Sequence, residues 1–382
     1  MKEYMVVLGR EPELAVAELA AVAKRLALPF AFSSINTEIA VVRGEYTPQF
    51  LNMLAGTVKV AEVLGETATG RASLISFLSD KVEEGERREF GLSWYGAKPP
   101  RWLLAVGLEL KKLLREQAGH VRFVTSREAA LSSVVVKKNK LLPPVGYDFV
   151  LVPRGEQVLV GRTVWVQDFE AWSQRDYGRP ERDARVGMLP PKLARLMLNL
   201  AQVPEGGGVL DPFCGSGTVL QEAALMGYRH LVGVDADAKG IERTRANFAW
   251  LKNRQPQLPQ PALMVSDVRK LPTLLHGTTF EAIVTEPYLG PPLRGREDVR
   301  RLEQIQRELT ELYRDSLKTL VHMLKLGGRI VMVWPIIKPG RGELALPLMA
   351  ELKKLGLVLV DALPKEAPPE WRTIRGTLLY AR

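Results

Sequence analysis

Several acidic and glycine residues of this chain follow short apolar runs and could together hold a small ligand. Asp211 ends the run GVLD and is followed by PFCGSGT, in which Gly215 and Gly217 are positions where a backbone can approach a ligand closely. Asp235 ends the apolar run HLVGVD, and Asp267 follows LMVS. Because ligands of open α/β sheets bind outside the carboxyl ends of the strands, we expect these residues to share one pocket.

The glycine turn fits neither of two common nucleotide-binding motifs. A dinucleotide fingerprint requires Gly or Ala three residues after Gly217, where this chain has Leu220. A P-loop requires Gly-Lys-Ser/Thr, and Gly217 is followed by Thr218. A strand-to-helix turn without a ligand is the alternative.

The carboxylate of Asp235 could accept both ribose hydroxyls of a nucleoside, although a helix-capping role would explain Asp235 alone equally well.

The elements around these residues alternate between apolar runs and amphipathic segments. A helical run, KLARLMLNLAQ, precedes the first apolar run, and LKLGGRIVMVWP supplies a turn and a fifth strand. We predict a long amphipathic helix over Glu303–Leu326 and a terminal pair of strands at Leu357–Val360 and Gly376–Tyr380. Residues 191–382 should therefore form an α/β domain.

The front of the chain lacks a catalytic constellation and mixes helices with strands. Over residues 1–65 we predict strand Tyr4–Leu8, helix Glu13–Leu26, a strand pair within Phe30–Val42 and helix Pro48–Val63, an order that suggests a ferredoxin-like α+β unit. Residues 66–167 continue with helices Ala72–Glu84 and Trp102–Gln117 and with strands that include SSVVV. The polar, arginine-rich residues 168–190 are predicted to be a linker.

Composition limits the classes of protein that are possible. A chain of 382 residues, 46% apolar and 25% charged, can form two or three globular domains. The single cysteine, Cys214, excludes an intramolecular disulfide, and four scattered histidines offer no paired metal ligands, so we expect no metal. No run reaches the roughly 18 apolar residues that span a bilayer, so we expect a cytoplasmic protein without a membrane segment. The oligomeric state is undetermined, with a monomer favoured.

The net charge of +10 suggests a polyanionic partner. The densest group of cations, here called the lysine cluster, consists of Lys137, Lys138 and Lys140 in VVVKKNKLL. A solvated loop between two strands would also explain it.

The sequence DPFCGSGT resembles the first motif of the class I S-adenosylmethionine-dependent methyltransferases, in the branch that methylates amino groups of nucleic acids. The order of acid-bearing strand ends matches the same family. The resemblance implies a Rossmann-like methyltransferase domain that binds S-adenosyl-L-methionine, with Asp211 in the first motif, Asp235 on the ribose and Asp267 on the adenine amino group. The further cofactor contacts that it implies are Phe213, Gly215, Gly217, Ala236 and Val268.

The loop Thr285-Glu286-Pro287-Tyr288 stands where this branch carries Asp/Asn/Ser-x-Pro-aromatic, so Thr285 replaces the usual acid. An exocyclic amine is a poor nucleophile, and its N–H groups must be held on acceptors. The candidates are the backbone carbonyl of Glu286, fixed by Pro287, and either Thr285 Oγ or the Glu286 carboxylate. Tyr288 would stack on a flipped base. A Pro-aromatic turn without chemistry is the alternative.

The front half resembles the ferredoxin-like plus THUMP arrangement of tRNA-modifying enzymes, which implies a module that grips the tRNA acceptor end. The segment before the catalytic domain resembles that of THUMP-containing tRNA guanosine N2-methyltransferases, which implies that Leu189 and Pro190 lie near the methionine end of the cofactor. Arg294 could contact RNA phosphates, or it could pair with acids on the next helix.

The leading hypothesis is thus S-adenosylmethionine-dependent methylation of the N2 amine of a guanosine in tRNA. Three alternatives stay open: an rRNA guanine N2-methyltransferase, a DNA amino-methyltransferase, and an RNA-binding protein that has lost activity.

Overall fold

The computed structural model describes residues 1–83, 87–118, 120–182, 188–293, 297–337, 344–372 and 377–381. The chain divides into an amino-terminal unit, Met1–Phe169 with Leu363–Pro369, and a carboxyl-terminal unit, Glu170–Ala362 with Glu370–Arg382. Across the described ranges, no helix combines the length and the apolar character that crossing a membrane requires. The same ranges contain no group of three or more His, Cys, Asp or Glu side chains arranged to hold a metal ion.

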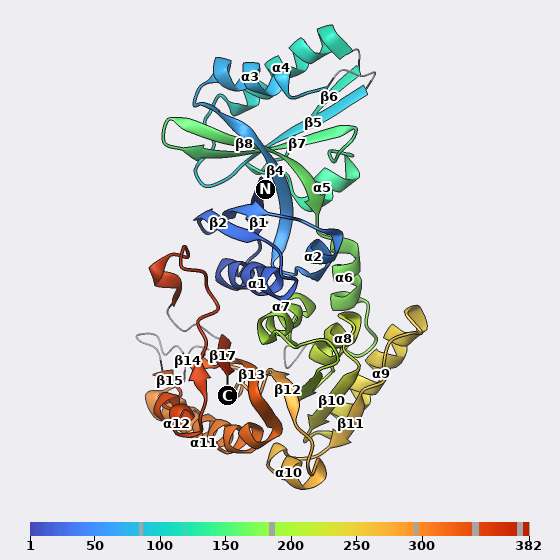
Figure 1. The fold of residues 1–382 in the computed structure, drawn as a ribbon, viewed down its shortest axis with the longest axis vertical. Coiled ribbons are helices and arrows are strands. Elements are labelled where there is room, and N and C mark those ends of the chain that lie inside the picture. The colour runs from blue at the N-terminus through green and yellow to red at the C-terminus, as the bar shows by residue number, and fades with distance from the viewer. Residues whose placement is uncertain are drawn as a thin grey trace. The chain divides into compact units, whose positions relative to one another are not determined.

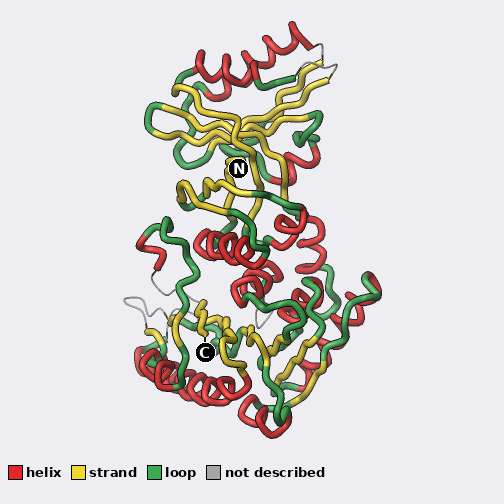
Figure 2. Tube along the Cα trace, in the orientation of Figure 1, coloured by secondary structure: helices red, strands yellow, loops and turns green. Residues whose placement is uncertain are grey.

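The amino-terminal unit is built on one sheet, whose described strands follow the order β2-β3-β1-β4-β8-β7-β5-β6 and run together in yellow in Figure 2. The strands are β1 (Lys2–Leu8), β2 (Phe30–Ile35), β3 (Ile39–Gly44), β4 (Thr57–Ala68), β5 (Arg87–Trp94), β6 (His120–Val124), β7 (Gly146–Arg154) and β8 (Gln157–Val166). The helices are α1 (Pro12–Arg25), α2 (Pro48–Met53), α3 (Arg71–Asp80), α4 (Leu103–Ala118) and α5 (Ser133–Lys138). Helices α3 and α4 pack on this sheet through a buried cluster that includes Leu78, Leu110 and Phe149.

Strand β4 corrects the helix predicted over Pro48–Val63. Helix α2 ends at Met53, and the chain then enters a 12-residue strand that pairs with β1 and β8 on its two sides. The β-branched residues of TVKVAEV favour a strand, and pairing on both sides satisfies the backbone donors and acceptors of its buried middle. The domain boundary predicted near residue 65 consequently falls inside β4.

Helix α5 corrects the strand predicted at SSVVV. Ser132 caps the helix, because its Oγ accepts a hydrogen bond from Val135 N at 3.3 Å. Val136 is buried and packs the short helix against a cluster that includes Val124 of β6. Lys137 and Lys138 therefore lie in the last turn of a helix, and not in a loop between two strands.

A buried ion pair fixes the chain just before α5. Lys59 Nζ lies 2.8 Å from Asp148 Oδ2 and also donates to the carbonyl of Leu131 at 3.0 Å. The Asp148 carboxylate accepts further hydrogen bonds from Ser93 Oγ and Thr163 Oγ1, both at 2.6 Å. Because the pair is fully hydrogen-bonded, it can hold the start of α5, and with it the lysine cluster, in one position.

The carboxyl-terminal unit is built on a second sheet, whose described strands follow the order β11-β10-β9-β12-β13-β17-β16. Its elements are α6 (Phe169–Tyr177), α7 (Pro191–Ala201), β9 (Gly208–Asp211), α8 (Thr218–Leu225), β10 (His230–Asp235), α9 (Ala238–Arg254), β11 (Ala262–Val265), the 3₁₀-helix η1 (Val268–Lys270), α10 (Leu271–Leu274), β12 (Phe280–Thr285), α11 (Val299–Met323), β13 (Leu324–Val333), β14 (Ile336–Ile337), β15 (Leu344–Ala345), α12 (Met349–Lys354), β16 (Val358–Leu359), the 3₁₀-helix η2 (Pro369–Arg372) and β17 (Thr377–Ala381). Strands β9 to β13 are parallel, and β17 runs antiparallel to β13 and β16.

The strand order reverses at β9, which pairs with β10 on one side and with β12 on the other. Helices α7, α8 and α9 cover one face of the sheet, and α10 and α11 cover the other (Figure 1). On the second face, Leu309 and Tyr313 of the amphipathic α11 join a buried cluster with Leu210 and Ile283. The predicted terminal strand pair is confirmed, since β16 pairs with β17. A reversal of this kind opens a crevice at the carboxyl ends of the strands.

Candidate functional site

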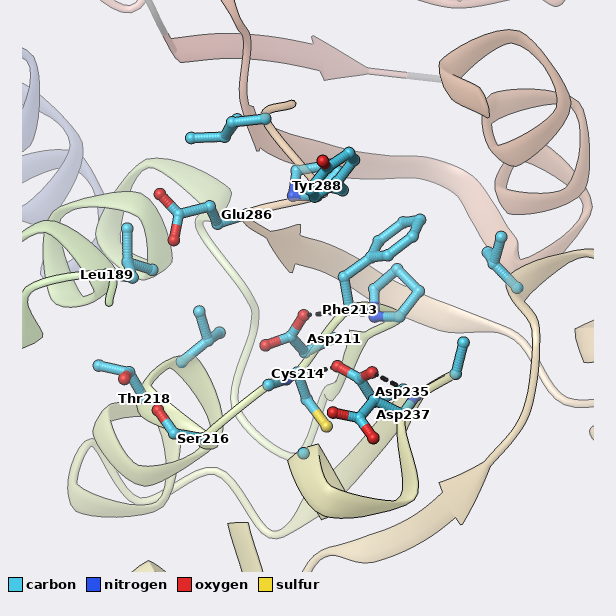
Figure 3. Close-up of a pocket in the computed structure, with 18 of the residues that line it drawn as sticks. Leu189, Asp211, Phe213, Cys214, Ser216, Thr218, Asp235, Asp237, Glu286 and Tyr288 are labelled. Atoms are coloured by element: carbon cyan, nitrogen blue, oxygen red, sulfur yellow. Dashed lines mark hydrogen bonds between the residues drawn. The ribbon is translucent and has the colours of Figure 1, made fainter. Parts of the chain in front are cut away.

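A pocket of about 730 Å³ lies at the carboxyl ends of β9, β10 and β12, beside the reversal of strand order (Figure 3). The structure brings together in its lining most of the site residues predicted from the sequence. These are Leu189, Asp211, Phe213, Gly215, Asp235, Ala236, Asp267, Val268, Glu286, Pro287 and Tyr288. Pro190, Gly217 and Thr285 were also predicted, but they are absent from the lining.

Two glycines in the left-handed region form the turn between β9 and α8. Gly215 has φ +50° and Gly217 has φ +80°. A Cβ built on Gly215 would meet no atom within 4 Å, whereas a Cβ on Gly217 would lie 2.7 Å from Cγ2 of Thr244 on α9. Gly217 is therefore required by the turn and by the close packing of α9, and the ligand contact predicted for it stays a prediction.

Asp235, the last residue of β10, links the glycine turn to the start of the next helix. Its Oδ2 accepts a hydrogen bond from Gly215 N at 2.8 Å, and its Oδ1 accepts one from Asp237 N at 2.8 Å. Each oxygen keeps a second lone pair, so the carboxylate can still accept hydroxyl groups of a ligand. The capping role and the ribose-binding role considered for Asp235 are thus compatible.

Asp211, the last residue of β9, is only 2% exposed. Thr285 Oγ1 donates to Asp211 Oδ1 at 2.7 Å, and Phe213 N donates to the same oxygen at 3.3 Å. Burial raises the pKa of Asp211 to about 7 from an ordinary value of 3.8. Because Asp211 lines the pocket and both bonds end on Oδ1, Oδ2 is left for a ligand.

Asp267 follows β11 and caps the short helix η1. Its carboxylate forms a two-point ion pair with Arg269, Oδ1 to Nε at 2.9 Å and Oδ2 to Nη2 at 2.6 Å. The hydrogen bonds from Arg269 lower the pKa of Asp267 to about 2. The carboxylate therefore stays ionised at neutral pH and can accept a further hydrogen bond from a ligand amino group.

The loop after β12 presents Glu286 and Tyr288 to the pocket and turns Thr285 away from it. Thr285 is fully buried, and its hydroxyl is committed to Asp211. Figure 3 shows the Glu286 side chain directed toward Leu189. Burial raises the pKa of Glu286. Of the two side chains considered as amine acceptors, Glu286 is thus the one that reaches the pocket.

Tyr288 is 55% exposed, and the backbone beneath it is fixed. The hydroxyl of Tyr313, from α11, donates to the Tyr288 carbonyl at 3.3 Å. Tyr313 is itself buried and packs edge-on against Trp334, with ring centroids 5.3 Å apart. Because more than half of Tyr288 is exposed and the residue lines the pocket, its ring is accessible to a planar group.

The residues predicted to bind RNA are not in this pocket. The lysine cluster belongs to the amino-terminal unit, where all three side chains are exposed and Lys137 lies 3.8 Å from Asp168. Lys140 follows α5 with φ +55°. Arg294 lies outside the described residues.

Two family models match parts of this chain. A model described as RMKL-like, methyltransferase domain, matches residues 179–338, and a model described as DNA methylase matches residues 102–245. The structure is similar to that of TrmN from Thermus thermophilus, with a TM-score of 0.59 and 17% identity over 100% of this chain and 99% of that one. The chain has an α/β methyltransferase fold.

Curated relatives share part of this methyltransferase sequence. The tRNA (guanine(10)-N2)-dimethyltransferase of Methanothermobacter thermautotrophicus is 36% identical over 149 residues, which cover 39% of each chain. The protein of the same name from Methanocaldococcus jannaschii is 29% identical over 183 residues, 47% of this chain and 48% of that one. Human tRNA (guanine(10)-N(2))-methyltransferase TRMT11 is 27% identical over 229 residues, 50% of this chain and 47% of its own. The chain thus spans half or less of the length of these relatives.

Several residues of the methyltransferase pocket were missed by sequence reasoning. Ser216 and Thr218 stand inside the glycine motif, whose small polar residues were a usable signal. Arg243 on α9 and Leu312 on α11 also line the pocket, but each lies within a regular amphipathic helix, where nothing local distinguishes a pocket residue from a surface or core residue. Only the packing of these helices brings the two side chains to the site.

Proposed function

We propose that this protein transfers the methyl group of S-adenosylmethionine to the exocyclic N2 amine of a guanosine in tRNA. The observation that carries the proposal is that the Glu286-Pro287-Tyr288 loop shares one pocket with the carboxylates of Asp211 and Asp235. The relatives named above as tRNA guanine N2-methyltransferases support guanosine as the target.

The residues of the pocket fit this cofactor. The volume of about 730 Å³ lies within the usual range for small-molecule sites, roughly 300 to 1,000 Å³. Asp235 has lone pairs available for ribose hydroxyls, Asp267 can accept from an adenine amino group, and Val268 offers an apolar wall to the base. When bound, the cofactor supplies a methyl group made electrophilic by a sulfonium sulfur.

The protein's own contribution is mainly to position the amine. Tyr288 would stack on the guanine, and Glu286 would accept a hydrogen bond from the N2 amino group. Because burial raises the pKa of Glu286, its carboxylate is a better acceptor for the proton that N2 loses as the new N–C bond forms. Pro287 is buried and limits the backbone freedom of the loop, so the two side chains are held in place before the base arrives.

We further propose that the amino-terminal unit binds the RNA. Its first elements, β1-α1-β2-β3-α2-β4, with sheet order β2-β3-β1-β4, support the ferredoxin-like unit expected from the sequence, and the lysine cluster is exposed to a polyanion. The THUMP assignment of residues 66–167, the linker at 168–190, the monomeric state and the cytoplasmic location stay predictions.

Methylation of DNA is a second candidate, because a DNA methylase family model matches residues 102–245. Purified protein should be incubated with labelled S-adenosylmethionine and, in separate reactions, with tRNA, rRNA and duplex DNA, followed by mass spectrometry of the released nucleosides. We expect N2-methylated guanosine from tRNA only, and none from the Glu286→Ala variant.

Each other outcome of this experiment contradicts the proposal in a different way. Methylated guanosine from rRNA alone would identify rRNA, and not tRNA, as the substrate. Methylated adenine or cytosine from DNA would favour the second candidate. Protein that binds the cofactor and tRNA but transfers no methyl group would be an inactive RNA-binding protein.

A further inference from the structure

The loop that follows β12 lines the pocket with exposed side chains. Tyr288 is 55% exposed and Leu289 is 40% exposed, and both belong to the pocket lining. An exposed side chain has few neighbours to hold it in one place. The position of the Tyr288 ring therefore depends on the contacts that hold the main chain beneath it.

This main chain lies on one stripe of α11. Gly290 has φ +98°, and a Cβ built on it would lie 3.3 Å from Ile305 Cγ2 and 3.3 Å from Leu309 Cδ1. Both separations are shorter than ordinary van der Waals contacts, so a glycine is what allows the loop to rest directly on the helix. Tyr313 follows at the same spacing of four residues and therefore lies on the same stripe.

Tyr313 supplies a second contact between α11 and the loop. Its hydroxyl donates to the Tyr288 carbonyl at 3.3 Å, and between described residues no other hydrogen bond ends on residues 287–290. Burial, followed by the nearby Glu286 carboxylate, raises the pKa of Tyr313 above its ordinary value of 10. The hydroxyl therefore keeps its proton at neutral pH and acts as a donor.

Tyr313 is itself held by the core of the carboxyl-terminal unit. It is 1% exposed, and its ring packs edge-on against that of Trp334. Both rings belong to a buried cluster that also contains Leu309 of α11 and Ile330 of β13. Because a close-packed side chain cannot move without disturbing its neighbours, the hydroxyl is a fixed point under the loop.

We propose that Tyr313 is a positioning residue for methyl transfer, which orients the Tyr288 ring by holding the Tyr288 carbonyl. The inference rests on the proposed function, in which Tyr288 stacks on the target guanine. Tyr313 is not in the lining of the pocket, so it acts through Tyr288 and not on the substrate. A ring that is already oriented does not have to be ordered when the base arrives, so the amine reaches the sulfonium methyl in a productive geometry more often.

Removal of the hydroxyl alone gives the first test. Tyr313→Phe keeps the ring against Trp334, and it should lower the single-turnover rate of methyl transfer to the tRNA that the wild type methylates. The expected loss is about 3- to 5-fold, in the lower half of the range for one hydrogen bond, because 3.3 Å is a long separation for two oxygens. The affinity for S-adenosylhomocysteine, measured by calorimetry, should change by less than about twofold.

A second variant disturbs the same loop at its other contact with α11. Gly290→Ala places a Cβ against Ile305 and Leu309, so it should displace the main chain and lower the rate at least as much as Tyr313→Phe. Thermal melting of each free variant establishes that it is folded before rates are compared.

Tyr228→Phe is the matched control. Tyr228 is 4% exposed, belongs to the same unit, and donates through its hydroxyl to the Val203 carbonyl at 3.2 Å. It is not in the lining of the pocket. The variant loses a hydrogen bond of the same kind and length as Tyr313→Phe, so it should lower the melting temperature by a similar amount and leave the rate of methyl transfer unchanged.

Two further measurements separate positioning from general stabilisation of the fold. In a double-mutant cycle, Tyr313→Phe should change the rate by less than about 1.5-fold once Tyr288→Ala has removed the ring through which it acts. The second measurement does not need activity. Backbone order parameters from NMR relaxation should fall at residues 288–290 in Tyr313→Phe, and they should stay at the wild-type values in Tyr228→Phe.

Four results would overturn the inference. A wild-type rate in Tyr313→Phe would show that the hydroxyl is not needed. An equal loss of rate with and without the Tyr288 ring, or unchanged order parameters at residues 288–290, would assign Tyr313 a structural role. These three results leave methylation by the wild type intact and contradict this inference alone. Wild-type protein that methylates no guanosine would overturn the proposed function, and this inference with it.

Discussion

Replacing Asp211 by Asn tests the electrostatics of the pocket with little change of shape. Thr285 Oγ1 and Phe213 N both donate to Oδ1 of Asp211, at 2.7 Å and 3.3 Å. An asparagine can place its amide oxygen at the same point and keep both bonds, while its NH₂ group replaces Oδ2. The substitution removes one buried charge and one acceptor. We expect it to alter both the stability of the free protein and the affinity for the cofactor.

The effect on stability follows from the pKa of Asp211, which burial raises to about 7 from 3.8. A carboxyl group whose pKa is higher in the folded than in the unfolded state keeps its proton in the fold after the unfolded chain has lost it. Its contribution is therefore fully present below about pH 4 and is lost as the pH rises to about 7, by about 1.4 kcal/mol per pH unit. Over that interval the loss is about 4 kcal/mol. Asp211→Asn has no such proton to lose, so its stability relative to the wild type should grow across the same interval.

Ionisation of Asp211 lowers the stability of the wild-type fold, but it should raise the affinity of the wild type for the cofactor. The ionised Asp211 carboxylate attracts the cationic groups of S-adenosylmethionine, so wild-type affinity should rise as the pH increases through about 7. Asp211→Asn cannot ionise, and its affinity should stay flat over this range and be about 10- to 100-fold weaker than that of the wild type near pH 8.

Both effects can be measured between about pH 5 and about pH 8. Urea unfolding of the ligand-free protein gives the free energy of unfolding. The transition that belongs to the unit with the pocket is identified beforehand as the one that S-adenosylhomocysteine shifts. Calorimetry gives the affinity for the cofactor. Asp315→Asn, which removes a half-exposed acid on α11, is the control and should leave both profiles unchanged. Stability curves that stay parallel for Asp211→Asn and the wild type would refute the raised pKa. Equal affinities near pH 8 would refute the contact between Asp211 and the ligand.

Asp235→Ala should weaken S-adenosylmethionine binding by about 1 to 3 kcal/mol, because hydrogen bonds to a charged group are lost; unchanged affinity in a folded variant would remove Asp235 from the site. Glu286→Gln should lower the single-turnover rate of methyl transfer by up to about 100-fold without weakening cofactor binding. Thr285→Val should instead weaken cofactor binding first, since its hydroxyl reaches Asp211; the reverse pattern would make Thr285 the amine acceptor. Replacing all three residues of the lysine cluster by Gln should weaken tRNA binding and flatten its salt dependence, and an unaltered slope would identify the cluster as ordinary solvated surface.

Local sequence was sufficient to predict the arrangement of the methyltransferase half. Asp211, Asp235 and Thr285 each end an apolar run, and in a parallel sheet such ends meet at one edge. The left-handed turn at Gly215 was likewise predictable, because the residue type reports directly on the backbone conformation. These features depend on residue type and spacing over a few positions, which a sequence displays.

Other features depend on which elements pack together, and the sequence does not display that. The first half of strand β4 was predicted as the end of a helix, although its β-branched residues favour a strand, and its pairing with β1 and β8 is what satisfies its backbone groups in the extended form.

The division of roles at the site was decided in the same way. Thr285 and Glu286 are neighbours in sequence, but the hydrogen bond from Thr285 to Asp211, 74 residues away, turns one side chain into the sheet and leaves the other in the pocket. The bond from Arg179 to Thr218 also joins segments that are remote in sequence. Which polar atoms meet across such distances is set by tertiary packing, because only packing determines which donors and acceptors are buried together and must satisfy one another.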